Sequence, residues 1–235
     1  MTISGFQKLT LVDYPEHTAC LIFTQGCNFR CPFCQNSSLV IKKNNCKIDE
    51  TEIFEYLDKR KKLIDGVCIS GGEPLLNEDI GLFIKKIKDK GYKIKIDTNG
   101  SRPKMLKKLI DNKLIDYVAM DIKNSFENYN ATSGVQVNID DIKESINILK
   151  NSNIDYEFRT TIVKQLHNFE NIEDILSYIG PDVKYYIQNY RDCDTVLKKG
   201  LSGFKEEELL DIKEKLEKKY PNIVIRGLRK EVNYV

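Results

Sequence analysis

The segment GCNFRCPFC, residues 26–34, contains three cysteines in a Cys-x3-Cys-x2-Cys spacing, namely Cys27, Cys31 and Cys34. Cysteine thiolates are the usual ligands of iron-sulfur clusters, and a cubane cluster has four irons. Three protein ligands would therefore leave one iron open to a group that is not protein. The spacing predicts a 4Fe–4S cluster with one vacant iron, held by a loop directly after a predicted strand.

Other uses of the cysteines fit less well. A structural zinc site usually has four Cys or His ligands, and the two histidines, His17 and His167, are not spaced as a partner pair. A disulfide framework is disfavoured because seven is an odd number of cysteines and no signal peptide is recognisable, which indicates a reducing compartment. A closed electron-transfer cluster would need a fourth thiolate, for which the chain offers Cys20, Cys46, Cys68 and Cys193.

The composition is that of one globular domain. A chain of 235 residues buries roughly three quarters of its unfolded surface, enough for one large core. Basic and acidic residues number 37 and 35, so no nucleic-acid-binding stripe is expected. No apolar run approaches the ~18 to 20 residues of a membrane span. We expect a soluble, cytoplasmic protein whose single domain covers residues 1–235, with neither nucleic acid nor a membrane as partner.

Short apolar runs alternate with amphipathic stretches along the chain. The runs are rich in β-branched and aromatic residues and predict strands at residues 19–24, 66–70, 93–97, 117–121, 154–163 and 184–190. Helical periodicity covers about 49–62, 78–90, 103–113, 139–150, 170–179 and 204–219. Asp49 followed by Glu52 marks one helix start, and Gly91 marks a helix end.

This alternation predicts an α/β fold with parallel strands inside and helices outside. A closed eight-unit barrel typically needs about 250 residues, whereas the six strand–helix units here occupy residues 19–191. We therefore expect an open partial TIM barrel, (β/α)6. A C-terminal helix and a strand-like run at 222–226 would follow within residues 200–235.

Polar motifs follow the predicted strands, at the ends where parallel α/β barrels carry their active sites. After the cysteine segment on the first strand, SGGEP at residues 70–74 follows the second, and its glycines let backbone approach a ligand closely. DTNG at 97–100 follows the third strand, and DIK at 121–123 follows the fourth. Taken singly each motif is a common turn or helix cap. Their agreement at four strand ends predicts one site.

Together these motifs resemble the signature of the radical S-adenosylmethionine (SAM) enzymes, including an aromatic residue, Phe33, before the third cysteine. The resemblance implies that the three cysteines bind one 4Fe–4S cluster and that SAM chelates its open iron. Electron transfer would split the sulfonium, and the 5′-deoxyadenosyl radical would take a hydrogen atom from the substrate, with no catalytic residue beyond these cofactors. The implied SAM site comprises Phe33, Asn36, Gly71, Gly72, Glu73, Asp97, Thr98, Asp121 and Lys123.

The chemistry of these side chains suggests individual roles. Glu73 or the carbonyls beside it can accept hydrogen bonds from the methionyl ammonium, and the ammonium of Lys123 suits the SAM carboxylate. Arg159 is a charge inside an otherwise apolar strand and would be costly if buried without a partner, so we expect it at the ligand site. Tyr190 and Arg191 end the sixth strand and are expected beside the adenosine.

Three stretches resemble the activating proteins of anaerobic ribonucleoside-triphosphate reductase and, more broadly, the pyruvate formate-lyase activases. They are GFQKLTLVDYP at 5–15, FTQGCNFRC at 23–31 and CQN at 34–36. Glu16 and Gln35 depart from the pattern, because they stand where glycine and histidine are expected. The cysteine-rich insert of activases with auxiliary clusters is missing from the sequence.

The resemblance implies an activase whose radical removes a Cα hydrogen from a glycine of a partner glycyl-radical enzyme, first of all an anaerobic ribonucleotide reductase. A flavodoxin or a ferredoxin-type protein would donate the electron. Little chain is left to close the lateral opening of a six-unit barrel, so a protein loop suits it better than a small molecule. Two alternatives stay open: a radical SAM enzyme acting on a small molecule or peptide, similar to 7-carboxy-7-deazaguanine synthase, and a non-catalytic iron-sulfur carrier or sensor.

Overall fold

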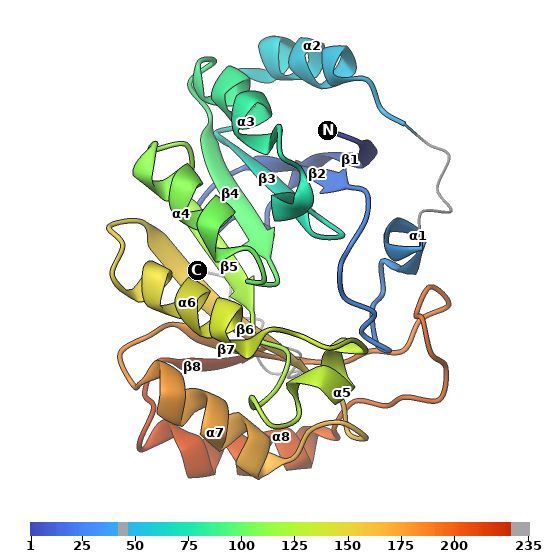
Figure 1. Cartoon of the computed structure of the whole chain (residues 1–235), viewed down its shortest axis with the longest axis vertical. Helices are drawn as coiled ribbons and strands as arrows, with labels where there is room; N and C mark the ends of the chain where they lie inside the picture. The colour runs from blue at the N-terminus through green and yellow to red at the C-terminus, as the bar shows by residue number, and fades with distance from the viewer. Residues whose placement is uncertain (42–46, 227–235) are drawn as a thin grey trace. The chain divides into compact units, whose positions relative to one another are not determined.

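The computed structural model describes residues 1–41 and 47–226 (Figure 1). The strands are β1 (Ile3–Thr10), β2 (Ala19–Thr24), β3 (Gly66–Gly71), β4 (Lys93–Thr98), β5 (Tyr117–Asp121), β6 (Asp155–Ile162), β7 (Tyr185–Asn189) and β8 (Ile223–Arg226). The α-helices are α1 (Ser37–Val40), α2 (Glu50–Arg60), α3 (Ile80–Lys88), α4 (Pro103–Asp111), α5 (Tyr129–Ser133), α6 (Ile139–Lys150), α7 (Phe169–Ile179) and α8 (Glu206–Glu217). A short 3-10 helix, η1, covers Pro74–Leu76.

The strands are hydrogen-bonded in chain order from β1 to β8. β1 runs antiparallel to β2, whereas β2, β3 and β4 are parallel, with Ile22 opposite Ile69 and Ile69 opposite Ile96. β6, β7 and β8 are also parallel to one another. Parallel neighbours need a crossover, and the helices between the strands supply it.

The chain folds into two compact units that interleave along the sequence. Unit 1 comprises Met1–Asn28, Asn36–Ala119 and Asp140–Tyr156. Unit 2 comprises Phe29–Gln35, Met120–Ile139 and the chain from Glu157 onward. Since neither unit is a continuous stretch, neither corresponds to a domain of the usual sequential kind. The expected single domain over residues 1–235 stays a prediction.

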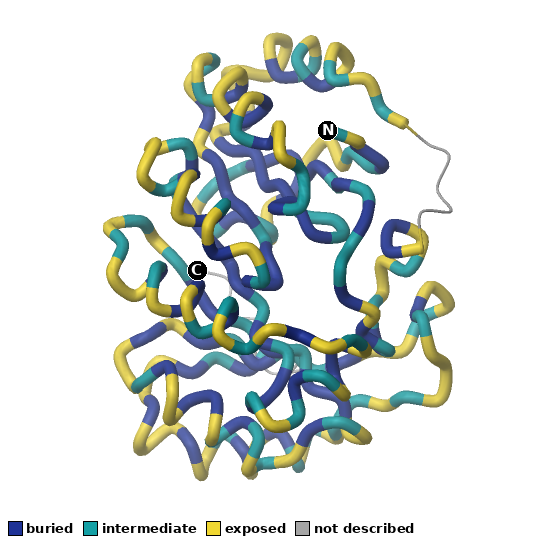
Figure 2. The backbone as a smooth tube through the Cα atoms, in the orientation of Figure 1, coloured by how far each residue is buried: buried dark blue, intermediate teal, exposed yellow. Residues whose placement is uncertain are grey.

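Unit 1 has a core of parallel strands whose residues are mostly buried. In β2, only Phe23 is not fully buried, as expected for a strand with both faces covered. The helices show a narrower apolar stripe: α6 buries Ile142, Ile146 and Leu149, which lie on one helix face. Figure 2 shows this contrast as buried strands and helices that alternate between buried and exposed residues.

Unit 2 repeats the pattern around β6 to β8. The α7 helix begins with a capping box between Asn168 and Asn171 and buries Ile172, Leu176 and Ile179. The α8 helix contacts β8 and buries Leu209, Ile212 and Leu216 at helical spacing. Each helix therefore covers the strands with one apolar stripe and leaves its charged face exposed.

The alternation predicted from the sequence is confirmed, with strand and helix ends shifted by a few residues. The strand-like run at 222–226 is β8, and the rest of the predicted C-terminal extension after residue 226 lies outside the described residues, as does Cys46. The sequence analysis missed β1, because Gly5 and the exposed residues 7–9 interrupt its apolar alternation. It also missed the short helices α1 and α5. Among residues 1–41 and 47–226, no helix has the length and apolar character needed to cross a bilayer.

Candidate functional site

The GGEP turn after β3 is held against the chain that enters the cysteine segment. The backbone N–H of Gly72 donates to the carbonyl of Thr24 (3.0 Å), and that of Glu73 donates to the carbonyl of Gly26 (2.8 Å). Gly71 has φ +122°, and a Cβ on Gly72 would lie 1.9 Å from the Gly26 carbonyl oxygen. Both glycines are therefore required by backbone geometry, and the turn positions the residue that precedes Cys27.

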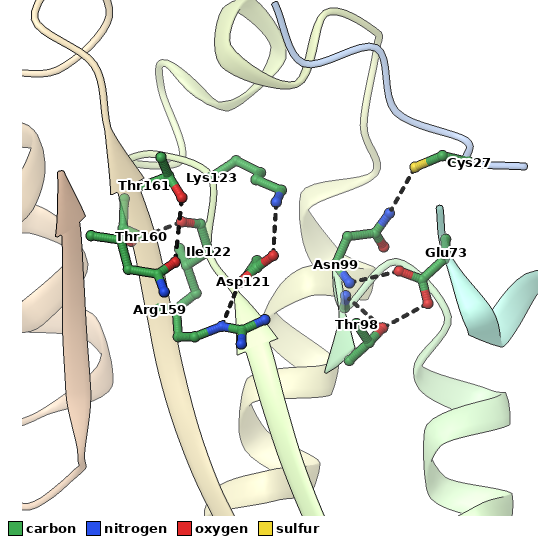
Figure 3. Close-up of polar contacts among 12 residues, drawn as sticks. Cys27, Glu73, Thr98, Asn99, Asp121, Ile122, Lys123, Arg159, Thr160 and Thr161 are labelled. Carbon is green, nitrogen blue, oxygen red and sulfur yellow. Dashed lines mark hydrogen bonds and ion pairs between the residues drawn. The ribbon is translucent and has the colours of Figure 1, made fainter. Parts of the chain in front are cut away.

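Glu73 ties the end of β3 to the end of β4 (Figure 3). Its side chain is 0% exposed. One carboxylate oxygen accepts hydrogen bonds from the Leu75 backbone N–H (3.0 Å) and the Thr98 hydroxyl (2.8 Å), and the other accepts from the Asn99 backbone N–H (2.7 Å). These bonds give Glu73 and Thr98 a structural task. Their expected contacts with SAM stay predictions.

Asn99, which the sequence analysis did not single out, extends this arrangement to the first cysteine. Its side-chain amide donates to Asn28 Oδ1 (3.0 Å) and lies 3.9 Å from the Sγ atom of Cys27 (Figure 3). Its own oxygen accepts from the hydroxyl of Ser101 (2.6 Å), which in turn accepts from the Asn28 amide (2.8 Å). The position of Asn99 in DTNG, directly after a strand, was the signal that could have found it.

Asp97 forms an ion pair with Lys95, a lysine that is only 2% exposed. The Lys95 ammonium also lies 3.7 Å from the Sγ atom of Cys68. A lysine this deeply buried normally needs a charged partner, and Asp97 provides it. The sequence analysis missed Lys95, although a second lysine in the strand pattern Lys-Ile-Lys-Ile was as unusual as the arginine at 159. Cys68 is buried.

In unit 2, Asp121 lies between two cations (Figure 3). Arg159 Nε donates to Asp121 Oδ1 (2.8 Å), and Lys123 Nζ donates to Asp121 Oδ2 (3.1 Å). Burial alone would raise the pKa of the Asp121 carboxyl, but Arg159 and then Lys123 outweigh it and lower the pKa to about 2. Arg159 is thus a paired charge, as its strand position required. Its contact with SAM stays a prediction.

The loop that carries Lys123 is fixed by His167, a residue with no role in the sequence analysis. Nδ1 of His167 accepts from the Val163 backbone N–H (3.0 Å), so the proton is on Nε2, which donates to the Lys123 carbonyl (2.8 Å). Burial lowers the pKa of His167, which keeps the ring neutral. The neutral ring therefore sets the path of the chain after β5.

The later part of the cysteine segment belongs to unit 2. The Cys34 N–H donates to the Cys31 carbonyl (3.0 Å) in a turn. The ring of Phe33 is buried and packs edge-on near His167, with ring centroids 6.4 Å apart. Burial alone would lower the pKa of Lys123, but Asp121 and then a negative charge on the Cys31 sulfur outweigh it and raise that pKa. A cationic side chain therefore lies in the surroundings of Cys31.

The three predicted cluster ligands are divided between the units: Cys27 belongs to unit 1, and Cys31 and Cys34 belong to unit 2. In the part of the chain that the structure describes, no group of three His, Cys, Asp or Glu side chains is arranged as a metal site. None of the three cysteines forms a disulfide, and soft thiolates are the correct donors for an iron-sulfur cluster. The three cysteines are therefore chemically suitable ligands for the cluster. Their arrangement around it stays a prediction.

The other cysteines differ in environment. Cys20 lies buried in β2, and burial raises the pKa of its thiol to about 12, which makes a thiolate there unfavourable. Cys68 is the buried neighbour of Lys95 described above. Cys193 is half-buried, and its Sγ atom lies 3.2 Å from the Thr195 hydroxyl.

The remaining predicted SAM contacts lie in two loops. Asn36 is exposed and begins α1. Tyr190 is only 3% exposed, and its hydroxyl donates to Asp192 (2.9 Å). Arg191 is exposed, and its carbonyl accepts from the Gln35 amide (2.8 Å). Their contacts with SAM stay predictions.

The sequence matches a family model over most of the strand–helix core. Residues 21–179 match the model described as Radical SAM superfamily. A protein of Methanocaldococcus jannaschii, named as a candidate glycyl-radical enzyme activating enzyme, is 37% identical over 96% of both chains. The 7-carboxy-7-deazaguanine synthase of Koribacter versatilis is 32% identical over 62% of each chain.

A solved structure supports the same fold. Streptococcus suis SuiB bound to S-adenosylmethionine has a TM-score of 0.70 at 16% identity, over 90% of this chain and 52% of SuiB. The α/β fold with a parallel-strand sheet is the one typical of the partial TIM barrel in this family. At this identity the likeness concerns the fold and not the substrate.

The buried carboxylate of Glu73 yields a prediction of stability. We expect Glu73→Gln to lower the free energy of unfolding by about 2 to 4 kcal/mol, because an amide NH2 would face donors that now bond to a charged oxygen. Urea denaturation measures the loss, and Glu78→Gln on the exposed neighbouring residue is the matched control. Equal stability of the Glu73 and Glu78 variants would contradict the structural role of Glu73.

The lowered pKa of Asp121 yields a prediction of pH dependence. A carboxyl with a pKa of about 2 in the folded state and about 3.9 unfolded stabilises the protein above pH 4, and this stability is lost as the pH falls toward 2. On acidification from pH 5 to pH 3, the free energy of unfolding of the Asp121→Asn variant should therefore fall by roughly 1 to 2 kcal/mol less than that of the wild type, with both proteins free of metal. Thermal denaturation at each pH measures this, with Asp111→Asn on the exposed face of α4 as control. Identical pH profiles of wild type and Asp121→Asn would contradict the prediction.

Proposed function

Because this chain belongs to the radical SAM superfamily, we propose that it is an activase that generates a glycyl radical on a partner enzyme. Members of the family use a 4Fe–4S cluster and S-adenosylmethionine. The observation that carries the activase assignment is the 37% identity, over 96% of both chains, to a candidate glycyl-radical enzyme activating enzyme. When bound, the cluster would supply the one electron for reductive cleavage of SAM into methionine and the 5′-deoxyadenosyl radical.

In this proposal Cys27, Cys31 and Cys34 hold the cluster. Two features of the structure support the assignment: the amide of Asn99 lies beside the sulfur of Cys27, and a cationic Lys123 lies in the surroundings of Cys31. Hydrogen-bond donors and positive charges stabilise thiolate and the negative charge of a cluster. The donor chemistry and the local electrostatics thus both support a cluster at these three cysteines.

The binding of SAM is assigned to residues at the strand ends of each unit. In unit 1, the backbone around Gly71 and Gly72, fixed by the Glu73 carboxylate, would present carbonyl oxygens to the methionyl ammonium. In unit 2, the ammonium of Lys123 would bind the SAM carboxylate, while Asp121, itself bonded to Arg159, holds that ammonium in place. Phe33, Asn36, Asp97 and Thr98 complete the assignment.

The partner proposed is a glycyl-radical enzyme, with an anaerobic ribonucleotide reductase as the first candidate, and a flavodoxin or ferredoxin-type protein as electron donor. A glycine is the only residue whose Cα hydrogen lacks a side chain in the way. The six described cysteines form no disulfide, which supports a reducing cytoplasm as the proposed location.

A second candidate function is favoured by the identity to a 7-carboxy-7-deazaguanine synthase, an enzyme whose name indicates a small-molecule product. That relative matches only 62% of this chain. The activase relative matches 96%, so we rank the activase first.

The cluster assignment is tested by single replacements. Anaerobically reconstituted wild-type protein should hold about four irons. Replacing Cys27, Cys31 or Cys34 by Ala should abolish the EPR signal of the reduced cluster together with SAM cleavage, because each loss leaves the cubane short of a ligand. Cys193→Ala is the matched control and should retain both. A requirement for Cys20, Cys68 or Cys193 would instead indicate a closed, four-cysteine cluster.

The activase assignment is tested by EPR on a candidate partner. Reduced protein and SAM, mixed anaerobically with a glycyl-radical enzyme of the same organism, should give a glycyl doublet and one 5′-deoxyadenosine per radical. The partner in which the radical-site glycine is replaced by Ala is the control and should give no doublet. Multiple-turnover conversion of a pterin-like small substrate, with no radical on any such partner, would favour the second candidate. Failure of the reduced protein to cleave SAM at all would favour an iron-sulfur carrier.

A further inference from the structure

We propose that a polar cavity at the carboxyl ends of β6, β7 and β8 binds the carboxylate of an acidic side chain in a peptide segment of the protein substrate. This inference rests on the proposed function, because it assumes that the substrate is a protein. The cavity has a volume of about 310 Å³ and belongs to unit 2. The lining residues on which the argument depends are Gln35, Thr161, Gln188, Tyr190, Arg191 and Arg226.

The cavity lining carries two arginines and no acidic residue. Arg191 follows β7 and is exposed, while Arg226 ends β8 and is also accessible. Two guanidinium groups on one small cavity favour a carboxylate, which they bind through paired, charge-assisted hydrogen bonds.

Arg226 is held in place by its neighbours. Its guanidinium carbon lies 3.8 Å from the centre of the Tyr186 ring, and its NH2 group lies 3.7 Å from the buried Glu157 carboxylate. Glu157 also faces Arg159 at 4.0 Å, so one carboxylate is shared by two guanidinium groups. Stacking and a shared ion pair therefore orient Arg226 without cancelling its charge, which leaves it suited to bind an anion.

The charges around the cavity sum to a positive value. Among the residues that line the cavity, Arg191 and Arg226 contribute two positive charges and none contributes a negative charge, which gives an excess of +2. Asp192 follows Arg191 in the sequence but accepts a hydrogen bond from Tyr190 and does not line the cavity. The local field thus attracts an acidic group.

Two glutamine side chains of the lining match a peptide main chain. Gln35 donates to the Arg191 carbonyl (2.8 Å), and Gln188 accepts from the Thr161 hydroxyl (3.4 Å). Each amide therefore uses one end within the described protein and can offer its other end, an oxygen on Gln35 and an NH2 group on Gln188. A peptide next to the bound acidic residue presents the complementary N–H and carbonyl groups.

The aromatic residues near the cavity argue against a nucleotide. Bases are generally held by stacking on an accessible aromatic face. Tyr190 is the aromatic residue of the lining and is only 3% exposed, and the Tyr186 ring is stacked with Arg226. The volume is also at the low end of the roughly 300 to 1,000 Å³ of small-molecule pockets. One side chain with adjoining main chain fits these limits better.

The test compares two blocked tripeptides, acetyl-Gly-Glu-Gly-amide and acetyl-Gly-Gln-Gly-amide. Both are titrated against the full-length protein by saturation-transfer NMR, which detects weak binding. The acidic peptide should bind about tenfold more tightly, as expected for one charge-assisted bidentate contact. Arg226→Gln and Arg191→Gln should each bring the ratio of the two dissociation constants close to one, and Arg226→Lys should restore part of it.

Lys107→Gln, which removes an exposed cation from α4, is the matched control and should leave the ratio unchanged. A ratio near one in wild type, or an unchanged ratio in both arginine variants, would overturn the proposal. So would displacement of the acidic peptide by GTP at lower concentration than by acetate, because it would assign the cavity to a nucleotide phosphate. Circular dichroism of each variant separates loss of binding from loss of folding.

This experiment is independent of radical chemistry. A protein that binds the acidic peptide selectively and yet gives no glycyl radical would refute the activase assignment alone. A protein that installs the radical and shows no acid preference would refute the cavity assignment alone.

Discussion

The buried carboxylate of Glu73 is the interaction on which the described part of the cofactor region in unit 1 depends. It removes a full negative charge from water, which is tolerable only because donors on both sides satisfy it. Those donors come from the turn after β3 and from Thr98 and Asn99 at the end of β4. The carboxylate therefore links two strand ends, and Asn99 carries the same constraint to Cys27.

The glycines of the GGEP turn act together with this carboxylate: they permit the tight turn, and Glu73 fixes it in place. With Gly72 pressed against the Gly26 carbonyl, the turn has no room for a side chain. The Glu73 bonds add to the pairing that β3 and β4 already have in the sheet and extend it to the loops that follow these strands. The GGEP motif could be taken as a ligand-binding glycine loop, but its first role is to allow close packing of the backbone. Any contact with SAM would use a backbone that is already rigid, which reduces the entropy lost on binding.

In unit 2 a second carboxylate performs a related task by charge rather than by backbone hydrogen bonds. Asp121 holds both Lys123 and Arg159, and the neutral ring of His167 fixes the carbonyl of Lys123. The ammonium is thereby kept charged and oriented. A ligand carboxylate would bind a cation that protein contacts already hold in position.

Much of this could be predicted from the sequence. Strand periodicity predicted the parallel α/β order, and motif spacing placed Gly71, Glu73 and Asp121 at strand ends. The bonding of Glu73 could not be predicted, because its donors, Thr98 and Asn99, lie more than twenty residues away in the sequence. Lys95 was missed for a similar reason: one strand alone cannot tell whether a lysine points to solvent or to a buried partner.

Arg226, on which the cavity proposal depends, was not predicted from the sequence, and this has a physical cause. Chemistry at SAM is the same for every substrate, so the motifs before residue 123 are fixed by a cofactor of constant shape. In our proposal the later strands face the substrate, which differs from one enzyme to the next, so that no common spacing would constrain them. Arg226 belongs to this later part. A binding role for its guanidinium can be inferred only from the structure, which places Arg191, Gln35 and Gln188 around the same cavity. Specificity in such a protein is therefore a property of three-dimensional juxtaposition, whereas its cofactor chemistry can be read along the chain.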